Sequence, residues 1–351
     1  MPTACVNGVR LNYVQIEDRQ GGPHDDLLMV HGLATSLAFW YVPYAAEFAR
    51  QFRVTLFDLR GHGRSEMPAT GYTPQALAGD LVALMDALGI ERAHFVAHSF
   101  GGVVAMNFAC GHAHRVRSLV LADSHISAVR DAATRRQWPF GRRIQPILDR
   151  HGVDLDTRVP FFGYRLLTLV AQWQLRGEPV PPELLELVAP LMGGQGSRAA
   201  AQWLKLMETG DAERELMGDD GLGFERLRAL RFPILAMYGD NSQAHLTGEF
   251  LLDVWPHAEF RRVRDAGHFF PTSRPDEVIG TCRRFWSGEF DDPRRCQRAG
   301  EARRAWFRSD RVFTAGGQWF YATRENGRVG PFASAQSAAE ALSSFLASLQ
   351  P

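Results

Sequence analysis

Ser99 is the residue of this sequence best placed to act as a nucleophile. It stands in the segment "AHSFGG", residues 97 to 102, between a run of β-forming residues and a run of helix-forming residues. A strand that turns directly into a helix at a serine holds the hydroxyl above the sheet, and this crowded turn requires small neighbours. Ala97 and Gly101 meet that requirement. The segment predicts either a strained turn that carries a nucleophile or a tight turn that only needs small residues.

A serine nucleophile needs a base, and His268 is the histidine best placed to provide one. In "VRDAGHFFP" it follows the last strand of the predicted sheet and precedes a helix, so it lies where strand ends and loops build sites. His98 is expected to pack inside, because on an extended chain its side chain points away from that of Ser99. His112 and His114 form an H-x-H pair without a third ligand nearby, so we expect no metal.

Two backbone N–H groups are expected to bind the oxyanion that develops when a serine attacks a carbonyl. Leu33 follows His31–Gly32 at the end of an earlier strand, and Phe100 opens the helix after Ser99. Donors aimed at such an oxyanion contribute about 3–4 kcal/mol each in similar sites. The other interpretation of His31–Gly32 is a plain tight turn.

The composition is that of an ordinary globular protein without a charge bias. The 351 residues carry 39 basic and 39 acidic side chains, so no global charge favours nucleic acid or an anionic membrane. No run approaches the ~18 apolar residues of a membrane helix, and the N-terminus lacks the basic-then-apolar pattern of a signal peptide. The four cysteines are scattered without a C-x-x-C spacing. We therefore expect a cytoplasmic protein with reduced thiols, no nucleic-acid partner and no membrane span.

Strand and helix patterns alternate along most of the chain. Residues 1–124 and 229–287 predict two parts of one mostly parallel sheet flanked by helices, the α/β class. Residues 125–228 are helix-like and rich in large apolar residues, which predicts a helical domain inserted between the two parts. Near the N-terminus, "VRLNYVQI" and the turn-rich segment that follows it predict a β-hairpin.

The C-terminal end of the chain is expected to be separate from this sheet. Residues 288–309 are polar and charged, which predicts a linker. Residues 310–351 predict a small ββα module, because Asn326–Gly327 is a strong hairpin turn signal and a helix-like segment closes the chain.

Six motifs follow one another over roughly residues 4–287: "HGLATS", "DLRGHGRS", "AHSFGG", "VRSLVLAD", "FPILAMYGDNS" and "DAGHFF". Together, and in this order, they resemble the α/β-hydrolase fold family. The resemblance implies that Ser99 is the nucleophile, His268 the base and residues 125–228 a cap domain over the site. A serine at this turn points away from the family's epoxide hydrolases and haloalkane dehalogenases, which use an aspartate there.

The acid of the catalytic triad is where the sequence departs from the family's common pattern. Most members place an aspartate after the seventh strand in a Gly-x-x-Asp arrangement, and here that position holds Ser242. A subset of the family with Gly-x-x-Ser takes its acid from the loop after the sixth strand, where this sequence has Asp123. Asp240 is the alternative acid, two residues before the usual position. We favour Asp123, as the group that orients the imidazole and stabilises its charged form.

The C-terminal segment is similar to small GYF-like domains, which carry a W-x-Y…G-x-x-G-P-F pattern. This resemblance implies a proline-rich peptide or protein partner bound on an aromatic surface. The alternative is a hairpin that packs its aromatic side chains on its own helix. The matching residues are Trp319, Tyr321, Gly327, Gly330, Pro331 and Phe332.

We expect a serine hydrolase that cleaves a carboxylic ester or acyl thioester through an acyl-enzyme on Ser99, without a cofactor. The large apolar residues of the insertion indicate an apolar acyl or aromatic group in the small-molecule substrate. Two alternatives stay open: hydrolysis of a carbon–carbon bond in a diketone-like substrate, and a non-catalytic binding or scaffold protein on a hydrolase-like fold. The sequence carries no signal of the oligomeric state.

Overall fold

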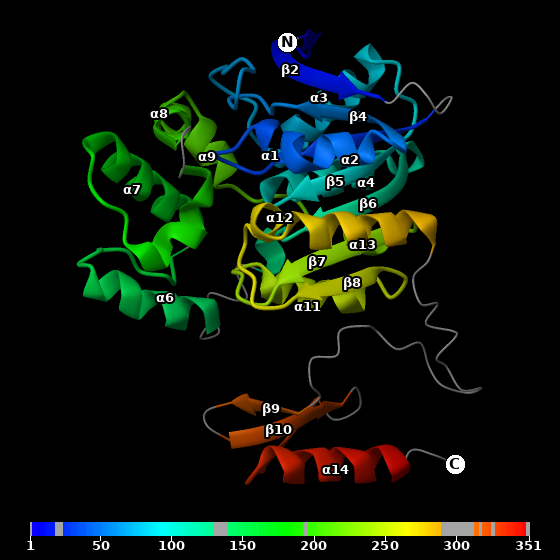
Figure 1. Cartoon of the computed structure of the whole chain (residues 1–351), viewed down its shortest axis with the longest axis vertical. Coiled ribbons are helices and arrows are strands. Elements are labelled where there is room, and N and C mark those ends of the chain that lie inside the picture. The colour runs from blue at the N-terminus through cyan, green and yellow to red at the C-terminus, as the bar shows by residue number, and fades with distance from the viewer. Residues whose placement is uncertain are drawn as a thin grey trace. The chain divides into compact units, whose positions relative to one another are not determined.

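A mixed sheet lies at the centre of the larger of two compact units, Met1–Arg303 (Figure 1). The computed structural model describes residues 2–17, 24–129, 139–159, 161–191, 196–288, 312–315, 318–323 and 327–348. The strands of the sheet are β1 (Thr3–Val6), β2 (Val9–Ile16), β3 (Asp25–Val30), β4 (Phe52–Phe57), β5 (Ala93–His98), β6 (Val116–Ala122), β7 (Ile234–Gly239) and β8 (Glu259–Val263). Their order is β1-β2-β4-β3-β5-β6-β7-β8. The strands from β4 to β8 in this order are parallel, whereas the β1–β2 and β2–β4 pairs are antiparallel.

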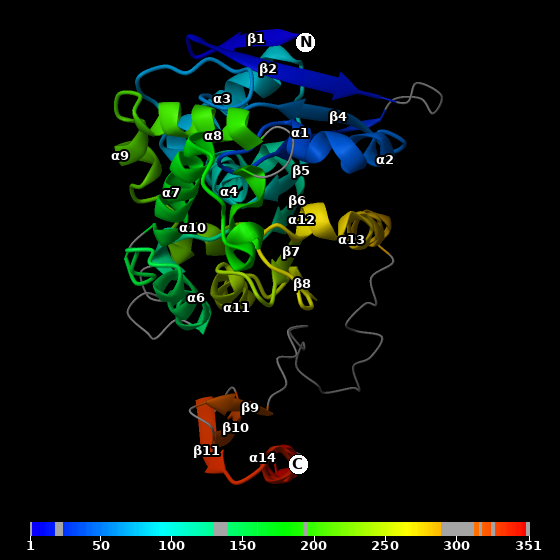
Figure 2. The same ribbon diagram turned by 60° about the vertical axis from the view of Figure 1, so that its left-hand side comes forward.

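Helices cover both faces of the sheet, as the view in Figure 2 shows. They are α1 (Ala38–Trp40), α2 (Ala46–Phe48), α3 (Pro74–Ala87), α4 (Phe100–Gly111), α11 (His245–Val254), α12 (Phe270–Ser273) and α13 (Pro275–Ser287). On one face, buried Trp40, Phe48 and Cys282 of α1, α2 and α13 join the central strands in one hydrophobic core. On the other face lie α3, α4 and α11. Burial on both faces explains why the central strands are apolar throughout.

Between β6 and β7 the chain leaves the sheet and forms a helical insertion. Its described helices are α6 (Pro139–Arg150), α7 (Phe162–Arg176), a 3₁₀ helix (Pro182–Leu191), α8 (Gly196–Met207), α9 (Ala212–Leu216) and α10 (Phe224–Arg228). The buried carboxylate of Asp220 joins the two ends of the insertion. It accepts hydrogen bonds from the N–H (2.5 Å) and hydroxyl (2.8 Å) of Ser127 and from the N–H of Leu222 (3.0 Å).

The predicted fold class is confirmed, and one local prediction is wrong. The alternating patterns correspond to the strands and helices of a mostly parallel α/β sheet with a helical insertion. The hairpin expected after "VRLNYVQI" does not form, because β2 pairs with β1 and β4, and β3 pairs with β4 and β5. The division into core and cap at residues 124/125 and 228/229 stays a prediction.

The second compact unit, Arg304–Pro351, has its own small sheet. Antiparallel strands β9 (Val312–Ala315), β10 (Gln318–Thr323) and β11 (Gly327–Phe332) contact helix α14 (Ala335–Ser348). The structure therefore adds a third strand, β9, to the predicted ββα order. Phe320 and Tyr321 of β10 are buried, and the Tyr321 ring stacks on Phe332 at 5.5 Å.

Two further predictions concern the linker between the two units and the lack of a membrane-spanning helix. Beyond Gly288, the linker expected at 288–309 lies outside the described residues. Within the part of the chain that the structure describes, no helix is long and apolar enough to span a membrane.

Candidate active site

Ser99 lies at the sharp turn where β5 passes directly into α4. Its φ of 55° and ψ of −124° are values that L residues rarely adopt, so the turn is strained. A side chain on Gly101 would place its Cβ 2.4 Å from the carbonyl oxygen of His31. One on Gly102 would place its Cβ 1.7 Å from Ser124 Oγ. The turn therefore requires the small residues that follow the serine.

Hydrogen bonds join Ser99, His268 and Asp123 in one chain. His268 Nε2 lies 2.8 Å from Ser99 Oγ, and His268 Nδ1 lies 2.6 Å from Asp123 Oδ2. An ionised carboxylate only accepts hydrogen bonds, so Nδ1 carries the ring proton and Nε2 accepts the serine O–H. Both distances are within the reach that a base needs to take a proton from a nucleophile. The imidazole is only 8% exposed and the aspartate is fully buried.

Asp123 is held at the end of β6 by groups at the end of the neighbouring strand β7 and in the loop that follows it. Its Oδ1 accepts the N–H of Gly239 at 2.9 Å, and its Oδ2 accepts the hydroxyl of Ser242. Burial and the negative charge of Asp123 raise the pKa of Tyr238 well above its usual value. The tyrosine hydroxyl therefore stays protonated, and it donates to the carbonyl of Ser124 at 3.0 Å. The carboxylate of Asp123 thus contacts Gly239, Ser242 and His268.

The alternative acid, Asp240, makes different contacts. Its carboxylate accepts hydrogen bonds from the Arg262 guanidinium (3.1 Å) and from the N–H of Ala266 (3.3 Å). These bonds tie the loop after β7 to the segment that leads to His268. Asp240 therefore fixes the loop that leads to His268. The structure brings Asp123, not Asp240, to the imidazole.

His98 packs behind the candidate base, as its position before Ser99 led us to expect. Its Nε2 lies 2.9 Å from the carbonyl oxygen of His268, and its ring stacks on Phe39 at 4.7 Å between centroids. Burial, with the nearby His268 as a second cause, lowers the pKa of His98 well below its usual value. A neutral ring must then carry its proton on Nε2 to donate to that carbonyl. His98 therefore holds the backbone of His268 without adding charge to the site.

The loop after β3 is fixed by the side chain of His31. The N–H of Leu59 donates to His31 Nε2 at 3.1 Å, so the proton of this ring is on Nδ1, which donates to the carbonyl of Gly32 at 2.7 Å. Thr35 Oγ1 donates to the same carbonyl at 2.7 Å. These bonds set the course of the backbone on either side of Leu33, which lines the pocket at Ser99.

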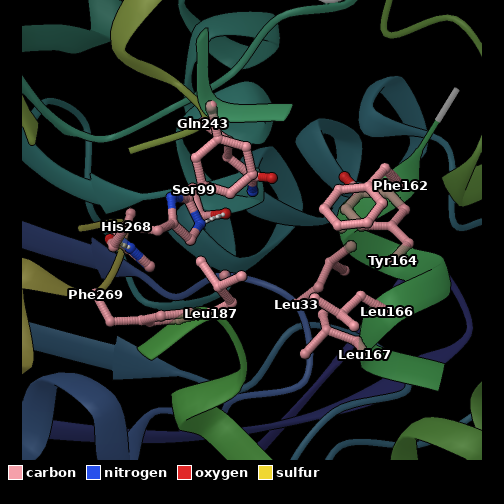
Figure 3. A pocket seen from close by; sticks show the side chains of 14 residues that line it. Leu33, Ser99, Phe162, Tyr164, Leu166, Leu167, Leu187, Gln243, His268 and Phe269 are labelled. Carbon is pink, nitrogen blue, oxygen red and sulfur yellow. Dashed lines mark hydrogen bonds between the residues drawn. The ribbon is translucent and has the colours of Figure 1, made fainter. Parts of the chain in front are cut away.

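A narrow pocket lies beside Ser99, and residues of the helical insertion form part of its wall (Figure 3). Its volume is about 40 Å³, which is room for about three waters. Figure 3 shows Leu33, Leu166 and Leu167 together on one side, with Ser99 and His268 facing them. A second lobe of about 50 Å³ shares Ser99 and His268 and extends towards Phe100. The other walls of the two lobes are Gly32, His98, His125, Phe140, Val159, Phe161, Phe162, Gly163, Tyr164, Leu187, Gln243 and Phe269.

Several residues of this site were not assigned a role from the sequence. Ser242 stands at the usual acid position, and its Gly-x-x-Ser context is the one sequence signal for its contact with Asp123. Gln243 contributes an amide to both lobes, and no motif indicates it. The insertion's Phe162 and Tyr164 belong to a segment in which apolar residues are common, so single wall residues could not be selected.

The comparisons with known proteins agree with this fold. Residues 26–275 match a family model described as alpha/beta hydrolase fold, and the chain belongs to that family. The expectation of an enzyme of the alpha/beta hydrolase family is thereby confirmed. Residues 297–351 match a second model, described as a domain of unknown function (DUF6316).

Three similar proteins illustrate the spread of this family. Over 296 residues the chain is 27% identical to a soluble epoxide hydrolase of Corynebacterium sp. (strain C12), and the match covers 81% of this chain and 96% of that protein. Over 107 residues it is 41% identical to the putative carbamate hydrolase RutD of Caulobacter sp. (strain K31), covering 29% of this chain and 40% of that protein. The crystal structure of the enol-lactonase from Burkholderia xenovorans LB400 superposes with a TM-score of 0.59 at 23% identity, covering 82% of this chain and all of that one.

Proposed function

We propose that this protein is a serine hydrolase that cleaves a small carboxylic ester or acyl thioester through an acyl-enzyme on Ser99. The observation that carries the proposal is the hydrogen-bonded chain from Ser99 Oγ through the His268 imidazole to Asp123. It has the arrangement of nucleophile, base and orienting acid that activates a serine. Ser99, at one end of these hydrogen bonds, lies on a strained turn and lines a pocket.

The reaction follows from these positions. His268 Nε2 takes the proton of Ser99 as Oγ attacks the carbonyl carbon, and the N–H groups of Leu33 and Phe100 stabilise the oxyanion. Nε2 then gives the proton to the leaving alcohol or thiol. A water that His268 activates releases the acid from the serine in the same way. Asp123 stabilises the charged imidazolium in both halves of the reaction.

The helical insertion acts as a cap in this proposal. Its residues supply the apolar side of the pocket, and the lobes at Ser99 are small. We therefore propose an apolar acyl group of short length as the substrate group next to the carbonyl. Water exclusion by such a cap strengthens the electrostatic interactions of the site.

Ser99 also separates this proposal from epoxide hydrolysis, the activity in the name of the relative from Corynebacterium. By the family resemblance, epoxide hydrolases carry an aspartate at this turn. A serine paired with a histidine suits acyl transfer. Hydrolysis of a carbon–carbon bond, the earlier alternative, would use the same three residues.

A peptide-binding role of the C-terminal unit stays a prediction, and the burial of Phe320 and Tyr321 favours aromatic packing within that unit.

A substrate panel tests the proposal. Initial rates are measured for 4-nitrophenyl esters and matching N-acetylcysteamine thioesters of increasing acyl length, with styrene oxide and a vinylogous 1,5-diketone as competing classes. We expect turnover of short acyl esters or thioesters, and a loss of at least about 10³-fold in kcat for Ser99→Ala. Turnover of the epoxide or the diketone alone would show that the proposed substrate class is wrong.

A further inference from the structure

A second cavity lies between the helical insertion and the loops that follow β3 and β4. Its volume is about 480 Å³, far larger than the lobes at Ser99. Its walls come from the loop segments 34–39 and 58–64, from α8 and from Asn12. It is therefore built by both parts of the larger unit and is large enough for an organic molecule.

This cavity is separate from the pocket at Ser99. Leu33 lines the pocket at Ser99, whereas the next residue, Ala34, lines the second cavity. Among the described residues, the walls of the second cavity and those of the two lobes have no member in common. The backbone at Leu33 and Ala34 therefore lies between the small pocket at Ser99 and the larger second cavity.

The charged groups of the second cavity do not balance. Arg64 and Arg198 are exposed at its edge, and within the described part of the chain neither guanidinium group has an acidic partner. Asp58 is the acid of the wall, and three donors already bind its carboxylate: the N–H groups of Leu37 (2.7 Å) and Arg64 (2.9 Å) and the amide of Asn12 (2.7 Å).

The remaining walls are neutral and partly apolar. Burial lowers the pKa of His62 to about 3, so this ring carries no charge near neutral pH. Phe39 and Ala199 are partly exposed in the wall and Ala38 is exposed, so they offer apolar surface, whereas Trp203 and Leu206 are only 1% exposed. Guanidinium groups bind carboxylates through two parallel N–H···O bonds, and apolar walls accept the body of such a ligand.

We propose that this cavity binds a small organic monocarboxylate with an apolar body. Arg64 and Arg198 hold the carboxylate, and the body lies against Phe39, Ala38 and Ala199. A bound ligand covers the segment that begins at Ala34, directly after one of the proposed oxyanion donors. The site does not depend on the proposed hydrolase chemistry, because its ligand makes no contact with Ser99.

Calorimetric titration of the full-length protein with 2-naphthoate tests this site. We expect saturable binding to the native protein and to Ser99→Ala. The double variant Arg64→Gln/Arg198→Gln should bind about tenfold or more weakly, because both charge-assisted contacts are lost. Arg165→Gln is the matched control, since Arg165 is an exposed arginine of the same insertion that lines neither cavity. Its affinity should equal that of the native protein.

The neutral analogue 2-naphthalenemethanol separates carboxylate recognition from apolar binding. It should bind about tenfold or more weakly than 2-naphthoate to the native protein. The two single arginine variants serve if the double variant fails to fold, which circular dichroism reports. Unchanged 2-naphthoate affinity in folded arginine variants, equal binding of the alcohol, or no binding to the native protein would each overturn the proposal. Because the readout is binding, none of these results bears on whether Ser99 is catalytic.

Discussion

The hydroxyl of Ser242 donates a hydrogen bond to the buried carboxylate of Asp123. Ser242 stands at the position after β7 where, by the family resemblance, most members carry the acid itself. Here that position supports an acid that comes from the end of the neighbouring strand β6. The same carboxylate oxygen contacts His268 Nδ1, so the acid and the residue at its usual position lie within one hydrogen-bond network.

The two candidate acids should differ strongly in their effect on turnover. Asp123→Asn should lower kcat about 10³- to 10⁴-fold, because an amide at this place favours the wrong histidine tautomer. Asp240→Asn is the control, and it should lower kcat less than about tenfold because its bonds to Arg262 and Ala266 only support the loop. Steady-state kinetics on the best ester of the panel measures both. The reverse order would show that Asp240 is the acid.

The contact between Ser242 and Asp123 predicts that the acid can be moved to the usual family position. The double variant Asp123→Ser/Ser242→Asp should have a kcat about tenfold or more above that of Asp123→Ser, because a carboxylate is restored beside the imidazole. Ser242→Asp alone should be less stable, since it buries two carboxylates side by side. A folded double variant that is no more active than Asp123→Ser would contradict this reading of the network.

Buried neutral histidines predict that the protein loses stability in mild acid. Burial lowers the pKa of His31, His62, His94 and His98, to about 3 for His62 and about 4 for His94. Below the unfolded-state pKa of about 6.5, the unfolded chain binds protons that the folded chain does not. These histidines should therefore lower the free energy of unfolding as the pH falls below about 6.5, whereas Glu259, whose pKa burial raises to about 7, acts in the opposite direction over the same range.

Urea unfolding between about pH 7.5 and pH 5.5 measures this effect, which is at most about 1.4 kcal/mol per pH unit for each histidine. His62→Gln should have a smaller slope than the native protein because one of the buried histidines is gone. A slope that is the same in His62→Gln as in the native protein would show that His62 is protonated in the folded state.

Asp220 should contribute strongly to stability because it joins both ends of the insertion. Asp220→Ala leaves the N–H groups of Ser127 and Leu222 without their acceptor, which should cost about 2–4 kcal/mol. Asp219→Ala is the control: Asp219 is exposed, and its bonds to Gly221 N–H and Ser127 Oγ should be worth less than about 1.5 kcal/mol. Urea unfolding compares the two, and equal losses would show that Asp220 does not join the ends.

Much of the fold was predictable because parallel strands buried on both faces are apolar along their length. The turn at Ser99 was predictable as well, since its crowding selects small residues at fixed positions. The hairpin predicted after β2 was wrong because local patterns indicate strands but not the partners with which they pair. β2 finds one of its partners, β4, only after the intervening β3.

The parts of the site that could not be predicted depend on contacts between distant segments. Asp123 and Asp240 both follow strands that end at the same edge of the sheet, so the sequence alone left two acids open. In the structure, Asp123 contacts both His268 and Ser242. The contact with Ser242 forms only because β6 and β7 lie side by side. The second cavity lies between α8 and loops that precede it by more than a hundred residues, and no motif marks such a space.

Labelling with a fluorophosphonate tests the central claim, that Ser99 is an activated nucleophile. Intact-protein mass spectrometry should show one phosphonyl adduct on the native protein, peptide mapping should place it on Ser99, and Ser99→Ala should give none. Asp123→Asn should label much more slowly than Asp240→Asn. A folded native protein that stays unlabelled, or that is labelled equally in the Ser99→Ala variant, would contradict the account.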